Sequence, residues 1–200
     1  MLKTWSILIP TTPNRSEVLN RLVTELQKQI DEINAEPFIR IDILEDDFEL
    51  SIGEKRNILV QRTESDYLSF FDSDDMPSAN YIKLMFYSIQ HEPDCVGIRG
   101  LVTWSGKNPT IFEHSLKHTL FVRRSDGVLI KPVAHLNPIK TSIAKQIMFP
   151  LINYTEDSAW SKRLIDSGLL KNEIMIDSEP VYLYLFDEPN SDSVKHRHKF

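Results

Sequence analysis

The first half of the chain alternates strand-like apolar segments with helix-like segments, and this alternation restricts the possible folds more than any other feature. Strands are expected at residues 5–9, 38–44 and 67–71, and Pro10 is expected to end the first. After each strand, apolar residues recur at the spacing of one helix face. Strand–helix–strand units of this length join parallel strands through right-handed crossovers. The sequence therefore predicts an α/β fold, with a mainly parallel central sheet flanked by helices.

Polar residues at the predicted helix starts support this alternation. Ser51 and Glu54 have the spacing of a capping box, in which each side chain bonds the backbone of the other residue. Asn14 or Ser16 is expected to cap the first helix, and Ser78 the third.

The second half has weaker signals, which predict a smaller antiparallel part. Expected elements are strands at residues 96–104, 120–123, 128–130 and 181–185, a hairpin turn at 125–127, and helices at 141–148 and 155–168. No linker separates the halves. We therefore expect one domain over residues 1–200, with a polar tail at 190–200.

Composition narrows the class of protein. The chain has 23 Lys and Arg against 29 Asp and Glu, a net charge of −6, which disfavours a nucleic-acid binder. Cys95 is the single cysteine, so no internal disulfide is possible and a reducing compartment is expected. No apolar run reaches the ~18 residues of a membrane span, and the first residues lack a signal-peptide pattern. We expect a cytoplasmic protein without a membrane span.

Three polar clusters follow the three predicted parallel strands. They lie at residues 11–15, 45–47 and 72–75. The carboxyl ends of parallel strands meet at one edge of a sheet, and ligands of such folds bind outside that edge. The clusters are therefore expected to form one ligand site.

The last cluster concentrates negative charge. Asp72, Asp74 and Asp75 would repel one another unless a cation lies among them. A hard divalent cation with oxygen ligands, Mn²⁺ or Mg²⁺, fits this set and could also hold a diphosphate. The alternative is an acidic turn before the next helix. The position after a buried parallel strand favours the cation.

Two further charged groups have both a chemical and a structural interpretation. Lys55 and Arg56 could neutralise phosphate, or Arg56 could pair with a strand-end carboxylate; the alternative is a solvated helix face. Glu156 and Asp157 lie at a helix start and could supply a general base. Alternatively, they are there only because the helix dipole favours acidic residues at that end.

None of the six histidines belongs to a compact metal motif. His135 lies in a predicted loop and could contact a substrate, while His196 or His198 could add a metal ligand if the tail folds back. An ordinary surface or core histidine is the alternative for each. The sequence has neither the Gly-x-Gly-x-x-Gly dinucleotide motif nor a P-loop.

Taken together, these motifs resemble the GT-A-type glycosyltransferases of the family 2 type, over about residues 4–193. The matching segments, in chain order, are 6–11 for the opening strand and nucleotide loop, Asp46, 51–57 for the Gly-x-x-Arg-Asn helix start, 67–75 for the Asp-x-Asp strand, 155–157 for the Glu-Asp motif, and 181–184 with 190–193 for the closing strand and loop.

The resemblance implies a role for each matching residue. The nucleotide-sugar site would comprise Thr11, Arg15, Asp46, Arg56, Asp72 and Ser73. Asp74 with Asp72 would hold Mn²⁺ or Mg²⁺, with Asp75 as a further candidate ligand. Asp157 would be the general base, with His135 and Glu156 as acceptor-side candidates. Residues 1–100 would form the nucleotide-binding half, and 101–190 the acceptor half.

The implied reaction moves one sugar from a nucleotide-diphospho-sugar, a UDP-sugar, to a hydroxyl of a glycan, glycoprotein or glycolipid, with inversion. The Gln-x-x-Arg-Trp motif of processive members is absent, so a single transfer is expected. GT-A enzymes often have a metal-binding histidine at a position where this chain has Phe186-Asp187-Glu188. Either Asp187 or a tail histidine replaces that ligand, or the ligand is missing.

Two other functions remain open. A sugar nucleotidyltransferase could share the sheet, but such an enzyme should have a glycine-rich basic loop after the first strand. Residues 10–15, at that position, contain no glycine. A binding module on the same fold would hold nucleotide or glycan without turnover.

Overall fold

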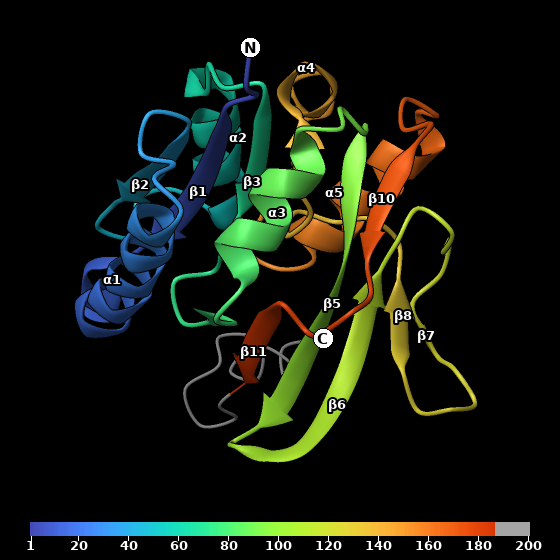
Figure 1. Cartoon of the computed structure of the whole chain (residues 1–200). Helices are drawn as coiled ribbons and strands as arrows, with labels where there is room; N and C mark the ends of the chain where they lie inside the picture. Colours follow the sequence, from blue (N-terminus) through green and yellow to red (C-terminus); the bar gives the residue numbers. More distant parts are fainter. Residues whose placement is uncertain (187–200) are drawn as a thin grey trace.

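The computed structural model describes residues 1–186, whose strands form one mixed sheet of eleven strands with helices on both faces (Figure 1). Hydrogen-bonded neighbours run in the order β2 (Ile39–Glu45), β1 (Trp5–Thr11), β3 (Tyr67–Phe70), β9 (Ile139–Lys140), β5 (Cys95–Trp104), β6 (Lys107–His114), β8 (Leu129–Lys131) and β7 (Val122–Arg123). Off this path, β10 (Glu173–Ile176) and β11 (Tyr182–Phe186) pair with β5, and β4 (Met76–Pro77) pairs with β11. The helices are α1 (Ser16–Glu32), α2 (Ile52–Arg62), α3 (Tyr81–Ile89), α4 (Thr141–Ala144) and α5 (Glu156–Asp166), with a short 3₁₀ helix, η1, at Pro13–Arg15.

The part of the sheet formed by β2, β1 and β3 is parallel, as the alternation of strands and helices predicts. Strand β1 pairs in parallel with β2 on one side and β3 on the other. The crossovers through α1 and α2 return the chain to the same end of the sheet each time. Antiparallel pairs lie further along, between β5 and β6 and between β7 and β8. The β7–β8 turn contains Gly127 at φ +89°, which confirms the hairpin predicted at residues 125–127.

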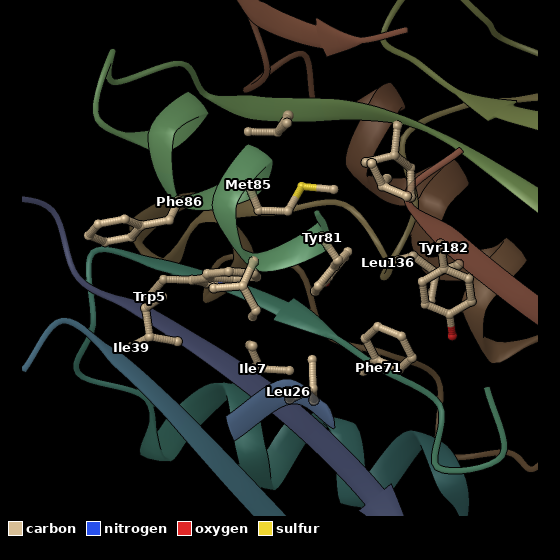
Figure 2. Close-up of a cluster of buried hydrophobic side chains, with 14 of the residues drawn as sticks. Trp5, Ile7, Leu26, Ile39, Phe71, Tyr81, Met85, Phe86, Leu136 and Tyr182 are labelled. Atoms are coloured by element: carbon tan, nitrogen blue, oxygen red, sulfur yellow. The ribbon is translucent and has the colours of Figure 1, made fainter. Parts of the chain in front are cut away.

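Successive side chains of β1 point to opposite faces of the sheet, and a buried core lies on each face. Trp5 and Ile7 pack with Leu26 of α1 and Tyr81 of α3 in the first core, part of which Figure 2 shows. Leu8 points the other way, into a second core with α2 and α5. There Trp160 of α5 stacks on Phe149 with ring centroids 4.6 Å apart. Burial on both faces fixes the register of the parallel strands.

Several predicted boundaries were wrong. Strand β1 continues through Pro10 to Thr11, because both residues pair with β2 in a parallel ladder. Neither Asn14 nor Ser16 caps α1, since η1 precedes it and its first turn has no side-chain cap. Ser78 does not cap α3 either: the helix begins at Tyr81, after Asn80.

Strands β4, β6, β9 and β10 were not predicted, and helix α4 ends at Ala144, earlier than expected. Strand β6 begins with exposed residues, including Pro109, and so shows no apolar alternation. Strands β4 and β9 have only two residues each and depend on partners distant in sequence. The closing loop expected at 190–193 lies outside the described residues.

Candidate active site

The carboxyl ends of β1 and β3 and the first turns of α2 and α5 enclose a cavity of about 820 Å³. Its wall includes Lys55 and nine of the residues to which the resemblance gives a role, namely Thr11, Arg15, Arg56, Asp72, Ser73, Asp74, His135, Glu156 and Asp157. Of the three polar clusters predicted to meet at one sheet edge, those at residues 11–15 and 72–75 line the cavity, whereas residues 45–47 do not.

Arg56 is the central cation of the cavity, and α2 positions it. The helix begins with the predicted capping box, in which the Ser51 and Glu54 side chains each bond the other's backbone. Arg56 is 3% exposed, lies over the Phe70 ring and donates from Nη2 to Asp72 Oδ1 at 3.0 Å. Burial opposes its charge, but Asp72 and Glu156 outweigh burial and raise the pKa of Arg56. Arg56 therefore pairs with a strand-end carboxylate, one of the two roles predicted for it.

Gly53 brings the start of α2 against the loop that precedes α5. Its N–H donates to the Ile152 carbonyl at 3.2 Å, and any side chain there would collide with the Pro150 carbonyl oxygen. This close approach places the first turns of the two helices beside one cavity.

The loop after β3 directs Asp72 and Asp74 to cationic partners. Asp72 also lies 3.4 Å from His135 Nε2, and Asp74 Oδ1 lies 3.0 Å from Arg15 Nη1. Partial burial favours the neutral form of Asp72, but Arg56 and His135 hold its pKa far below the ordinary value. Asp72 is therefore ionised at neutral pH.

The donor set for a divalent cation is incomplete among residues 1–186. Asp72 and Asp74 offer the carboxylate oxygens that hard cations prefer. Asp75 points away, since its oxygens accept from Tyr182 Oη at 2.7 Å and the Leu185 N–H at 2.9 Å. In this part of the chain, no three or more His, Cys, Asp and Glu residues are grouped so as to hold a metal. The other candidate ligands, Asp187, His196 and His198, lie outside the described residues.

Asp46, expected in the nucleotide-sugar site, does not line the cavity. It pairs with the buried Lys55, and its Oδ2 accepts from the Leu50 N–H at 2.7 Å. Lys55 also donates to the Thr11 carbonyl at 2.8 Å. These bonds tie the ends of β1 and β2 to α2, so Lys55 has a bracing position that the sequence did not indicate.

Glu156 and Asp157 are adjacent in sequence but lie in different electrostatic surroundings. Asp157 Oδ2 pairs with Lys131 Nζ at 2.9 Å, and this cation, with His135, holds the pKa of Asp157 far below normal against partial burial. Burial raises the pKa of Glu156 to about 7, although Arg56 Nε lies 3.4 Å from its Oε1. One carboxylate is therefore firmly ionised, while the other titrates near neutral pH.

Sequence reasoning missed several residues around the site. Lys131 lies on the short strand β8, and Phe48, Asn153 and Tyr184 line the cavity from loops or a strand end. Tyr184 lies in the segment matched to the closing strand, but no role was given to it, and the other three belong to no motif. The partner of Lys131 is 26 positions away in sequence. Only the folded chain brings them to the site.

The sequence matches no protein-family model, and no curated protein is significantly similar to it. Solved structures do share its fold, and that fold is the GT-A glycosyltransferase fold. Residues 1–349 of Staphylococcus aureus TarS superpose with a TM-score of 0.58 at 14% identity, over 93% of this chain and 61% of that one. The TarS complex with UDP-GlcNAc superposes with a TM-score of 0.59 at 15% identity, over 91% and 58%. For the UDP complex the TM-score is 0.59 at 14% identity, over 91% and 60%.

The fold predicted from the resemblance to GT-A glycosyltransferases is thus confirmed. The chain spans about three fifths of the length of these TarS structures. Among the helices of residues 1–186, none has the length and apolar character needed to cross a membrane.

Proposed function

We propose that the chain is a glycosyltransferase that moves one sugar from a nucleotide-diphospho-sugar, a UDP-sugar, to an acceptor hydroxyl. The observation that supports this most is the set of residues that line the cavity at the sheet edge. It joins two arginines, the Asp72 and Asp74 carboxylates, and the Glu156–Asp157 pair. A structure with the same fold, TarS, has been solved with UDP-GlcNAc and with UDP.

The donor side of the proposal uses the loops after β1 and β3. Thr11, Arg15, Arg56, Asp72 and Ser73 bind the nucleotide diphosphate, and the two guanidiniums offset its negative charge. Mn²⁺ or Mg²⁺, bound by Asp74 with Asp72, would add further charge neutralisation to the diphosphate.

The acceptor side of the proposal uses α5. The ionised Asp157 carboxylate takes the proton of the acceptor hydroxyl as its oxygen forms the bond to the anomeric carbon. The bond from that carbon to the diphosphate breaks on the opposite face, and the nucleoside diphosphate leaves with the electron pair. The configuration is inverted. Buried His135 and Glu156 border the same space and would orient the acceptor, a hydroxyl of a glycan, glycoprotein or glycolipid.

Thermal unfolding with UDP, GDP, dTDP and CDP, each with and without Mn²⁺, tests the donor site. A ligand that binds only the folded protein raises the unfolding midpoint. We expect UDP with Mn²⁺ to give the largest shift and Asp74→Asn to remove most of it. Asp166→Asn is the matched control, because Asp166 is also exposed and ion-paired but lies off the cavity.

No shift with any nucleotide at millimolar concentration would contradict the proposal. Nucleotide binding without hydrolysis of UDP-GlcNAc or transfer to any acceptor would instead favour a binding module on this fold.

A further inference from the structure

Phe48 has a conformation and exposure that packing does not explain. It lies between β2 and α2, its φ is +62°, and 64% of the residue is exposed. Left-handed backbone is unusual for a bulky side chain and costs free energy. The ring belongs to neither buried core, yet it lines the active-site cavity. A ligand in that cavity would give the ring a contact surface.

The loop that carries Phe48 is fastened at both ends. Asp46 accepts the Leu50 N–H at 2.7 Å and pairs with Lys55, while Ser51 begins the capping box of α2. The ring therefore projects from a braced loop, so little order has to be gained when a ligand binds. Because the carboxylate of Asp46 is held by Lys55 and Leu50, the exposed group that the loop offers to the cavity is the ring.

The chemistry of the cavity changes along the sheet edge. The order β2-β1-β3 places Phe48 and Leu50 beyond β2, Arg15 beyond β1, and the Asp72–Asp74 pair beyond β3. The parts of a nucleoside diphospho-sugar follow the same order, because its flat, apolar-faced base would meet Phe48 and its anionic diphosphate would meet Arg15 and a cation held by Asp72 and Asp74. Asp157, on α5, contacts Lys131 of β8 and lies on the acceptor side, away from β2.

We propose that Phe48 is the platform on which the nucleobase of the donor stacks. This inference rests on the proposed function and deepens it, because it assigns the base end of the nucleotide site to the β2–α2 loop. Stacking on an aromatic ring is tolerant of base identity, since every base has a π face. The platform would therefore strengthen binding of all nucleoside diphosphates, with selection among bases left to other contacts.

Calorimetric titration with UDP and with inorganic pyrophosphate, both with Mn²⁺, tests the platform. Phe48→Ala should weaken UDP binding about tenfold or more and leave pyrophosphate binding unchanged. Phe48→Trp, which keeps a stacking surface, should retain the affinity for UDP. Tyr87→Ala is the matched control, because Tyr87 is a 53% exposed aromatic residue of α3 that does not line the cavity.

A second variant separates ligand binding from support of the fold. Glycine adopts positive φ without strain. Phe48→Gly should therefore lose UDP affinity as Phe48→Ala does, while the unfolding midpoint of the free protein does not fall.

Unchanged UDP affinity in Phe48→Ala, or a parallel loss of pyrophosphate affinity, would overturn the inference and leave the proposed function standing. A lower unfolding midpoint in Phe48→Gly would mean that the ring stabilises the folded protein, and this result would also overturn the inference. A wild-type protein that binds pyrophosphate but none of the four nucleoside diphosphates would overturn the proposed function and the platform together.

Discussion

At the scale of the residue, Asp157 is the side chain whose chemistry the proposed reaction depends on most. Asp157→Asn keeps the shape of the side chain but cannot take a proton. We expect the hydrolysis of UDP-GlcNAc, with water as the acceptor, to slow by about 10²–10⁴-fold, the usual contribution of a general base. UDP affinity should change little, because Asp157 pairs with Lys131, on the side of the cavity that we propose for the acceptor.

The rate of UDP release measures this effect, and titration with UDP measures binding. Asp166→Asn on the same helix is the control, since Asp166 pairs with Lys162 at the exposed far end of α5. A wild-type rate in Asp157→Asn would assign the base elsewhere.

The identity of Asp157 as a candidate could be predicted, but its surroundings could not. Glu156 and Asp157 are recognisable because they are adjacent and begin a helix. Lys131, which holds the pKa of Asp157 down, lies on a three-residue strand in the irregular half of the chain. Burial, which raises the pKa of Glu156, is likewise a property of the folded chain. Sequence can therefore suggest which groups are candidates for the reaction, whereas their protonation depends on contacts made only in the fold.

At the scale of the element, the start of α2 supports both the fold and the cavity. Ser51→Ala removes the Oγ acceptor of the Glu54 N–H and one half of the capping box. We expect a loss of about 1 kcal/mol in the free energy of unfolding, measured by urea titration. The loss in UDP affinity should be small, because Lys55 still fastens the helix to Thr11 and Asp46.

Ser16→Ala gives the matched control for this prediction. Ser16 is an exposed serine at the first turn of α1, where no side-chain cap is present. Its replacement should change the free energy of unfolding by much less than that of Ser51. Equal losses in the two variants would contradict the assignment of the cap.

The elements that could be predicted are those whose signals are local. The capping box of α2 and the Ser-Asp-Gly turn before β8 need only residues close in sequence. Strands β4 and β9 are formed by pairing across the sheet, with β11 for one and with β3 and β5 for the other. Nothing within two residues indicates such partners. The parallel core was therefore predictable, while much of the strand content beyond it was not.

At the scale of the whole molecule, the cavity forms because residues far apart in sequence meet at one edge of a single sheet. Asp72 and His135 are 63 positions apart, and Asp75 and Leu185 are 110 positions apart, yet each pair is in contact. The second contact fixes β11 against the loop that carries Asp72 and Asp74. The stability of the fold and the geometry of the cavity are thus coupled.

Glu156 lines the cavity and is buried by the fold, so the pH dependence of unfolding should show how this cavity residue affects the stability of the fold. Its pKa is about 7 in the folded protein, against an ordinary value of 4.5. Between these values the folded chain keeps a proton that the unfolded chain has lost. The free energy of unfolding contributed by Glu156 therefore falls as the pH rises from about 4.5 to 7. Glu156→Gln cannot ionise, so it should gain stability relative to wild type over this interval.

Urea titrations at pH 5 and pH 8 measure the free energy of unfolding of both proteins. The value for Glu156→Gln minus that for wild type should rise by about 1–3 kcal/mol from pH 5 to pH 8. Burial also lowers the pKa of His114 and His135, but these groups are common to both proteins and cancel in the comparison to first order. Glu32→Gln, an exposed position at the end of α1, should show no such change. Equal differences at the two pH values would mean that Glu156 is ionised in the folded protein. In that case Arg56 would hold two charged carboxylates, Asp72 and Glu156, and would have less charge free for a diphosphate.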